Sequence, residues 1–221
     1  MTETSVPLRV CVFFSGGCSA LKYLSENDPN YGEKYQVVGA FTDNHKAVGV
    51  YLVRDQRIPI WVIDFRRWLR HHNRKFNDLA ARAQYFTEVL GHVADFKPQL
   101  IMLSGFMLRI TEPLLGRFPI INVHPADLRI LGADGKPKYR GADVVADAIA
   151  DGATQTCSTI HVVTTEVDCG KIICVSDPLI VPEGVDPKAH QEDMKWLCDG
   201  PAYAQALAMI AGRFAAKEKI D

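Results

Sequence analysis

Long hydrophobic runs and an excess of charge of either sign are missing from this sequence. The longest apolar run near the N-terminus, Val10 to Phe14, is far shorter than the ~18 residues that cross a bilayer, and Arg9 interrupts any signal-type segment. The 25 Lys and Arg residues nearly balance the 26 Asp and Glu residues, so no global field attracts nucleic acid or anionic lipid. We therefore expect a cytoplasmic protein that binds neither a membrane nor nucleic acid.

Closely spaced cysteine pairs are missing as well. The six cysteines include no Cys-x-x-Cys pair and are sparse for 221 residues. This spacing argues against a zinc ribbon and against a disulfide scaffold, so we expect reduced thiols and no bound metal. The adjacent His71 and His72 do not change this, because neighbouring residues on a helix point in different directions. We interpret them as part of a solvated basic run.

Length and composition indicate one folded domain. With 48% hydrophobic residues the chain can bury a substantial core, and no internal repeat or low-complexity linker divides it. We predict a single domain over residues 1–221. Helices from about residue 187, broken near Gly200 and Pro201, are expected to close it.

Apolar strand-like runs alternate with amphipathic segments through the first half of the chain. Strands are predicted at residues 8–14, 35–42, 60–63, 100–103, 120–123, 159–163 and 171–175, and helices at residues 20–25, 47–57, 79–94 and 142–150. Continuously apolar strands separated by helices are typical of a parallel sheet covered on both faces. The sequence therefore predicts an α/β fold, with a Rossmann-like, mostly parallel sheet and helices on both faces.

Two polar residues, Asn122 and His124, interrupt the fifth of these strands just before Pro125. Residues two apart on a strand point to the same face, near the carboxyl end where open α/β sheets bind their ligands. By itself the pair is also compatible with a hydrogen-bonded strand end before a proline turn. A second polar feature, Asp168, follows the strand at residues 159–163 in a loop that turns at Gly170.

The order of these residues resembles the folate-dependent formyltransferases. In that family Asn-x-His-Pro after a strand and a later Asp before Gly form a catalytic trio, and Gly105-Phe106-Met107 precedes the first motif as it does there. The resemblance extends from Leu8 to about Ile180. It implies a formyltransferase fold and 10-formyltetrahydrofolate as the formyl donor.

The resemblance implies that Asn122, His124 and Asp168 act when an amine attacks the formyl carbon. That attack builds negative charge on the formyl oxygen, where positioned hydrogen-bond donors are effective. Asn122 can donate from its amide and His124 can donate if it is protonated. Asp168 would hold His124 charged or accept protons through a water. The alternative for Asp168 is a turn-capping aspartate. His161 is interpreted as a core or supporting histidine.

The first strand ends in a turn that the family's glycinamide ribonucleotide enzymes use for phosphate. Glycine permits close backbone approach, and amides at a helix N-terminus favour phosphate. Here Cys18 replaces the second glycine of the family pattern and Ala20 replaces its asparagine, so a turn without a ligand is the alternative. The resemblance implies acceptor contacts from Ser15, Gly16, Gly17, Cys18 and Ser19.

Further contacts are implied for both substrates. The folate-binding candidates are Gly105, Phe106, Met107, Leu108, Ile110, Thr164, Thr165, Glu166 and Val167. Additional acceptor candidates are Arg82, Tyr139, Arg140 and Glu192. For Arg82 and Glu192 the alternative is an ordinary solvated helix residue. Many family members place arginine directly after the methionine, but here Leu108 intervenes and Arg109 follows, so anchoring of the folate tail is expected to differ.

The acceptor loop is a hybrid of family patterns. Lys138-Tyr139-Arg140-Gly141 resembles the segment of formyltransferases that act on methionyl-tRNA or on nucleotide-linked amino sugars. We therefore predict formyl transfer to the primary amine of a small molecule. The first candidate for this acceptor is a nucleotide-linked amino sugar. The alternative is phosphoribosylglycinamide in purine biosynthesis. A further alternative, from a different functional class, is a regulatory protein that binds folate without catalysing a reaction. A homodimer is compatible with each of these interpretations.

Overall fold

The computed structural model describes residues 6–216, which divide into two compact units. The first unit comprises the chain up to Cys18 together with Gly32–Ile120, and the second comprises Ser19–Tyr31 and the chain from Ile121 onward. The expected single domain over residues 1–221 stays a prediction, and its ends, residues 1–5 and 217–221, lie outside the described residues.

Four parallel strands form the sheet of the first unit, in the order β3-β2-β1-β4. The strands are β1 (Leu8–Phe14), β2 (Tyr35–Thr42), β3 (Ile60–Val62) and β4 (Leu100–Leu103). β1 and β4 are almost wholly buried, as their continuous apolar sequences predicted. The remaining elements of this unit are helices α2 (Gly49–Asp55), α3 (Phe65–His71), α4 (Leu79–Ala94) and α5 (Leu114–Arg117).

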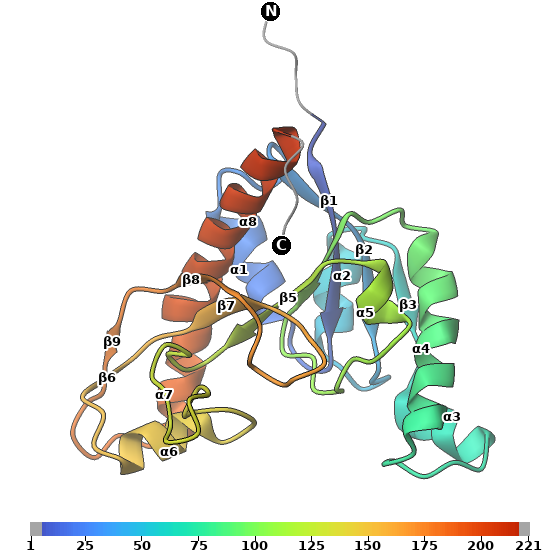
Figure 1. The fold of residues 1–221 in the computed structure, drawn as a ribbon. Helices are drawn as coiled ribbons and strands as arrows, with labels where there is room; N and C mark the ends of the chain where they lie inside the picture. Colours follow the sequence, from blue (N-terminus) through green and yellow to red (C-terminus); the bar gives the residue numbers. More distant parts are fainter. Residues whose placement is uncertain (1–5, 217–221) are drawn as a thin grey trace, which may run out of the picture. The chain divides into compact units, whose positions relative to one another are not determined.

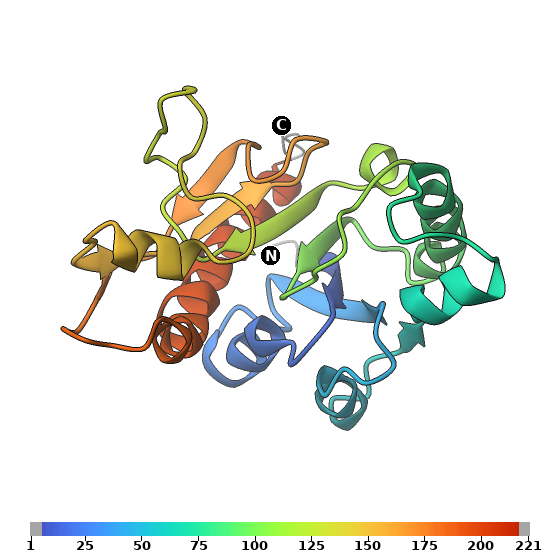
Figure 2. The same cartoon turned by 90° about the horizontal axis from the view of Figure 1, so that it is seen from below.

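Helices cover both faces of these strands. Figure 2 shows α2, in teal, and α4, in green, on opposite sides of the strands. Asp64 and Asp78 start α3 and α4, because each carboxylate accepts a hydrogen bond from a backbone amide three residues ahead. Helix α3 was not predicted from the sequence, since it has only seven residues and Phe65, Trp68 and Leu69 are too few to reveal a periodic pattern.

The second unit has an antiparallel arrangement. Its strands β5 (Ile120–His124), β7 (Thr159–Val162) and β8 (Ile172–Val175) run in the order β5-β7-β8, and both pairings are antiparallel. The short strands β6 (Gln155–Thr156) and β9 (Leu179–Ile180) pair separately. The helices are α1 (Ser19–Asn27), α6 (Val144–Ala150), α7 (Pro187–Met194) and α8 (Gly200–Ala215). Figures 1 and 2 both show α1 beside α8. The fold class is α/β with a mostly parallel sheet, as predicted.

The expected break near Gly200 and Pro201 was wrong. A π-helical segment, Lys195–Asp199, joins α7 to α8, so the backbone stays helical throughout. Pro201 lies in the first turn of α8, where its missing amide and fixed φ are tolerated. Gly200 is required for packing, because a Cβ atom there would lie 2.2 Å from the ring of Tyr23.

Candidate active site

Asn122 and His124 lie on one face of β5, as their spacing predicted. In the antiparallel pairing with β7, Asn122 is opposite His161 and His124 is opposite Thr159. His124 is buried, with 3% of its surface exposed, whereas Asn122 is partly exposed. The pair therefore presents one buried and one accessible polar side chain to the same space.

The loop between β7 and β8 brings Asp168 to this face. Its Oδ2 atom lies 3.5 Å from Nδ1 of His124, and the residue is 8% exposed. Asp168 has a φ of 55°, a left-handed conformation in which aspartate is tolerated better than most residues. A Cβ atom at Gly170 would lie 1.7 Å from the carbonyl oxygen of Val162, so this turn requires glycine. The predicted trio is thus assembled within one unit.

His161 contacts both Asn122 and Asp168. Its Nε2 atom lies 3.3 Å from Nδ2 of Asn122 and 3.5 Å from Oδ1 of Asp168. Its Nδ1 atom is 3.0 Å from the carbonyl oxygen of Val162, which fixes the ring. The sequence did not single out His161 as a site residue. Its place opposite Asn122 would have revealed it, but strand register is not visible in one sequence.

Burial controls the charge of His124. It lowers the pKa of His124 below its usual value, although Asp168 and the carbonyl of Tyr139 both favour the charged ring. Burial therefore favours the neutral ring, against the effect of Asp168, which favours the charged ring. The Nε2 atom lies 2.8 Å from the carbonyl oxygen of Tyr139, so the neutral ring carries its hydrogen on Nε2.

Asp168 keeps its negative charge in spite of burial. Burial raises its pKa, but the His161 ring, His124 and the backbone amide of Gly141 outweigh this effect, and the net pKa lies below its usual value. The Gly141 amide donates to Oδ2 at 3.0 Å. An ionised carboxylate at this position can accept a proton through a water, which was one of its two predicted roles.

The loop before α6 contacts the trio through its backbone. Tyr139 and Gly141 supply the two contacts described above, and the Arg140 side chain lies 3.0 Å from Asp134 and 4.0 Å from the sulfur of Cys169. The Tyr139 hydroxyl donates to Asp151 at 3.0 Å. The structure therefore brings the acceptor candidates Tyr139 and Arg140 close to the catalytic candidates.

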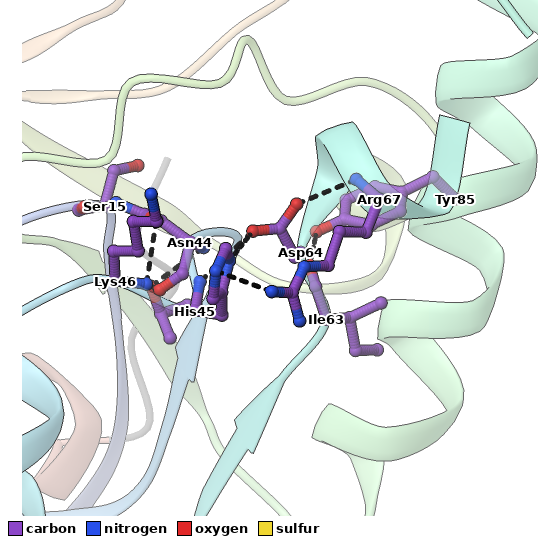
Figure 3. A network of polar contacts seen from close by, with 9 residues as sticks. Ser15, Asn44, His45, Lys46, Ile63, Asp64, Arg67 and Tyr85 are labelled. Atoms are coloured by element: carbon purple, nitrogen blue, oxygen red, sulfur yellow. Dashed lines mark hydrogen bonds and ion pairs between the residues drawn. The ribbon is translucent and has the colours of Figure 1, made fainter. Parts of the chain in front are cut away.

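In the first unit, the turn after β1 is held by the Ser15 side chain. Its hydroxyl donates to Asp43 at 2.6 Å and accepts from the Met107 amide at 3.0 Å. Burial raises the pKa of Asp43 in this setting. Figure 3 shows Ser15 beside Asn44, whose amide donates to the Ser15 carbonyl at 2.9 Å. Ser15 thus connects the turn after β1, where acceptor contacts are predicted, with the predicted folate-binding segment from Gly105 to Ile110, here called the donor segment.

The two glycines of this turn have free space beside them. Gly16 and Gly17 are exposed, and a Cβ atom at either position would meet nothing within 4 Å. Cys18 is buried and has a φ of 57°, so it keeps the left-handed conformation for which glycine is the usual residue. The altered turn therefore retains a glycine-type backbone at Cys18. Ser19 follows as the first residue of α1.

The donor segment alternates buried and exposed side chains. Phe106, Leu108 and Ile110 are buried, whereas Met107 is 74% exposed. Gly105 has a φ of 67°, and its carbonyl accepts from the Ser15 amide at 3.1 Å. The Phe106 ring packs 5.5 Å from Phe13, which fixes the turn to the core. The other predicted donor segment, Thr164 to Val167, belongs to the second unit and is exposed.

A polar network beyond the turn was not predicted. Figure 3 shows the His45 ring in contact with both Asp64 and Arg67. Nδ1 of His45 contacts Asp64, and Nε2 lies 2.8 Å from the guanidinium of Arg67. Asp64 also caps α3, and its contacts with His45 and the Arg67 amide outweigh burial and lower its pKa. The network anchors the start of α3 to the loop after β2.

Comparison with known proteins decides the family. The family model described as formyl transferase matches residues 8–195, most of the chain. The chain belongs to the formyl transferase family. Membership confirms the predicted family, the enzyme class and its formyl donor, 10-formyltetrahydrofolate.

Three proteins illustrate what this formyltransferase is similar to. The chain is 28% identical over 206 residues to the trifunctional purine biosynthetic protein adenosine-3 of Drosophila melanogaster, covering 91% of the chain but only 14% of that protein. It is 28% identical over 193 residues to phosphoribosylglycinamide formyltransferase of Mycobacterium tuberculosis, covering 86% and 80% of the two chains. The structure of glycinamide ribonucleotide transformylase 1 from Symbiobacterium toebii has a TM-score of 0.77 at 21% identity, covering 96% and 91%.

Two residues predicted to contact the acceptor, Arg82 and Glu192, differ in burial. Arg82 in α4 is 7% exposed, so the interpretation as a solvated residue was wrong. Its guanidinium donates to the carbonyls of Arg109 and Phe76, each at 3.3 Å, and burial followed by the charge of Arg109 lowers its pKa. Glu192 in α7 is exposed and pairs with Lys195, as expected of a solvated helix residue.

Neither metal ligands nor a membrane span were found in residues 6–216 of this formyltransferase. No group of three or more His, Cys, Asp or Glu side chains there could hold a metal ion. No helix in the same range is long and apolar enough to cross a membrane. His71 and His72 are exposed, in agreement with a solvated basic run.

Proposed function

We propose that this formyltransferase transfers the formyl group of 10-formyltetrahydrofolate to the primary amine of phosphoribosylglycinamide. The observation that carries the transfer step is the cluster of Asn122, His124 and Asp168 at the end of β5. The choice of acceptor is supported by the relatives, several of which are named phosphoribosylglycinamide formyltransferase. These relatives favour the alternative interpretation of the sequence over an amino sugar.

The trio has the chemistry that the transfer needs. The Asn122 amide and the Nε2–H group of neutral His124 are hydrogen-bond donors for the negative charge that develops on the formyl oxygen. Because Nε2 already contacts the Tyr139 carbonyl at 2.8 Å, that donor must be shared with the substrate or released to it. Ionised Asp168 accepts, directly or through a water, the proton that the attacking amine loses.

The turn after β1 supports a phosphate-bearing acceptor. The exposed Gly16 and Gly17 leave room for an anion, and the left-handed Cys18 keeps the backbone course that glycine would take. The Ser15 hydroxyl is engaged by Asp43 and Met107, so we assign the phosphate to backbone amides of the turn.

An amino sugar carried by a nucleotide remains the second candidate acceptor. It is favoured by one observation, the position of the Tyr139-Arg140-Gly141 segment beside Asp168. A nucleotide phosphate could pair with the Arg140 guanidinium in place of Asp134. Loss of the Arg140 side chain should then affect only the amino-sugar reaction.

The test compares catalytic efficiencies on the two acceptors. With 10-formyltetrahydrofolate as donor, we expect an efficiency of about 10⁴ M⁻¹s⁻¹ or higher on phosphoribosylglycinamide and a much lower one on a nucleotide-linked amino sugar. The reverse ratio would establish the amino-sugar enzyme. Saturable folate binding without transfer to either amine would favour a regulatory protein without turnover. The His124→Ala variant, prepared in parallel, controls for contaminating activity.

A further inference from the structure

Residues 130–138, between β5 and α6, form a short hairpin that has no part in the proposed reaction so far. The Gly132 amide donates to the Lys136 carbonyl at 2.8 Å, and the Gly135 amide donates to the Gly132 carbonyl at 3.1 Å. Gly135 has a φ of 72°, the left-handed conformation that often ends a three-residue hairpin turn. We call this segment the hairpin.

Burial does little to hold the hairpin in place. Ile130 and Leu131 are 46% and 59% exposed, and Ala133 and Asp134 near its tip are exposed as well. A segment that buries so little apolar surface gains little from packing. The position of the hairpin therefore depends on its polar contacts.

Two ion pairs connect the hairpin to neighbouring elements of the second unit. The Lys138 ammonium lies 2.8 Å from the carboxylate of Asp151, the residue that caps the C-terminal end of α6. The Lys136 ammonium pairs with Glu166 in residues 163–171, here called the β7–β8 loop. This hydrogen-bonded pair lowers the pKa of Glu166 below its usual value. The hairpin thus bridges α6 and the β7–β8 loop.

The β7–β8 loop needs support from outside itself. Its residues 164–167 are exposed and form neither helix nor strand, so packing contributes little to their position. Asp168 follows with a φ of 55°, a conformation that costs free energy in a residue with a side chain and persists where neighbouring contacts enforce it. The Gly141 amide holds the Asp168 carboxylate at 3.0 Å, and Lys136 holds Glu166 two residues earlier.

We propose that Lys136 is a positioning residue for formyl transfer. By pairing with Glu166 it keeps the β7–β8 loop in the conformation in which the Asp168 carboxylate faces His124 and can take the proton of the attacking amine. This inference rests on the proposed function, because it gives Lys136 a part in that reaction. Lys136 itself touches neither the trio nor the proton.

Lys136 acts through the geometry of the loop and not through its charge on Asp168. Burial raises the pKa of Asp168, and the His161 ring, His124 and the Gly141 amide lower it. These effects come from groups other than Lys136. Loss of Lys136 should therefore lower the rate by a similar factor at every pH and leave the acid limb of the pH profile in place.

The experiment measures the catalytic efficiency for the formyl donor across pH, with the acceptor on which the wild type is more efficient. We expect K136Q to lower this efficiency about threefold at low salt, as loss of an exposed ion pair allows, with less effect as salt rises. The acid limb should not move. K136R keeps the ion pair and should retain the wild-type efficiency.

Variants of Glu166 test whether the pair is the interaction that matters. E166Q should lower the efficiency about as much as K136Q, and K136Q/E166Q should be no worse than the poorer single variant, because both changes remove one interaction. The swapped variant K136E/E166K restores an ion pair and should exceed K136E by about threefold. A swapped variant no better than K136E would overturn the assignment.

Amide hydrogen exchange on the free protein supplies a readout that does not depend on activity. The amides of residues 163–171 should exchange about threefold faster in K136Q, because the loop opens more often without the ion pair. K188Q is the matched control: it removes an exposed cation of α7 in the same unit and should keep the wild-type efficiency and exchange rates.

The outcomes separate this assignment from the proposed function. Wild-type efficiency in K136Q would overturn the role of Lys136 and leave the proposed function standing. Lower efficiency with unchanged exchange in the loop would also overturn it, because Lys136 would then act on a substrate directly. A wild type that transfers the formyl group to neither amine would overturn both.

Discussion

His124 and Tyr139 form the hydrogen bond that determines which nitrogen of the histidine carries the proton. The carbonyl of Tyr139 lies 2.8 Å from Nε2 of His124, while the other ring nitrogen faces Asp168 at 3.5 Å. The backbone of one loop therefore sets the tautomer of the central residue in the site. A substrate oxygen that takes the place of the Tyr139 carbonyl would find a hydrogen already directed at it.

Removal of any trio side chain should lower turnover without unfolding the protein. We expect Asn122→Ala, His124→Ala and Asp168→Ala each to reduce kcat by ~100-fold or more, because each removes a group that acts on the developing charge or the proton. Double variants should be little worse than the poorer single variant, since the residues act as a unit. The measurement is steady-state kinetics with circular dichroism as the check of folding.

Asp177→Ala, which removes an exposed aspartate of the same unit, serves as the matched control and should retain normal kcat. A near-native rate in His124→Ala would contradict the assignment of the trio.

His161 should act as a positioning residue with a signature in the pH profile. Its electrostatic interaction with His124 lowers the pKa of His124, and its contact with Asp168 lowers the pKa of Asp168. The His161→Ala variant should therefore raise both pKa values and move the acid limb of the kcat profile to higher pH, with about a tenfold lower maximum. His161→Gln, which keeps an acceptor for Asn122, should recover part of the rate.

The control for this experiment is His190→Ala, which removes another buried histidine of the second unit, bonded to Thr156 at 2.8 Å. It should lower stability and leave the pH profile in place. An unchanged acid limb in His161→Ala would mean that His161 has only a packing role.

The left-handed backbone at Cys18 should be detectable as strain. With a φ of 57°, a cysteine costs about 1 kcal/mol more than glycine would. Both Cys18→Gly and Cys18→Ala remove the sulfur, but only the glycine variant relieves the backbone. We expect Cys18→Gly to be more stable than Cys18→Ala by about 1 kcal/mol in urea unfolding. If alanine is the more stable of the two, the turn does not hold this conformation in solution.

Asp199 should make the protein less stable as the pH rises. Burial raises the pKa of Asp199 to about 6, although the Ser158 hydroxyl donates to it at 2.6 Å. The folded state then holds the proton more tightly than the unfolded state, so stability falls between about pH 4 and pH 6 as the proton is lost. Asp199→Asn, which mimics the protonated form, should stabilise the protein by about 3 kcal/mol at pH 7.

Thermal unfolding at several pH values checks this expectation. The difference between Asp199→Asn and the wild type should vanish at about pH 3, where Asp199 is protonated in both the folded and the unfolded state. Asp193→Asn, at an exposed position in α7, is the control and should give no such pH dependence. A constant difference at all pH values would show that the effect is not one of ionisation.

The sequence alone determined most of the fold, and it predicted three polar side chains that the structure places close together. β1, β2, α4 and β4 were predicted with the bounds that the structure gives them, because apolar periodicity is a local property that each segment carries by itself. Asn122, His124 and Asp168 were found for a similar reason. A strand end and a glycine turn are local features, and their order along the chain carried the family resemblance.

Only the tertiary structure decided what surrounds those residues. The contact of His161 with Asn122 depends on strand register, and the contacts of Tyr139 and Gly141 with the trio come from backbone atoms, which no side-chain pattern records. The lowered pKa of His124 depends on burial, which outweighs the effect of Asp168. Register, backbone placement and desolvation arise from residues distant in sequence, and this is why they could not be predicted from the sequence alone.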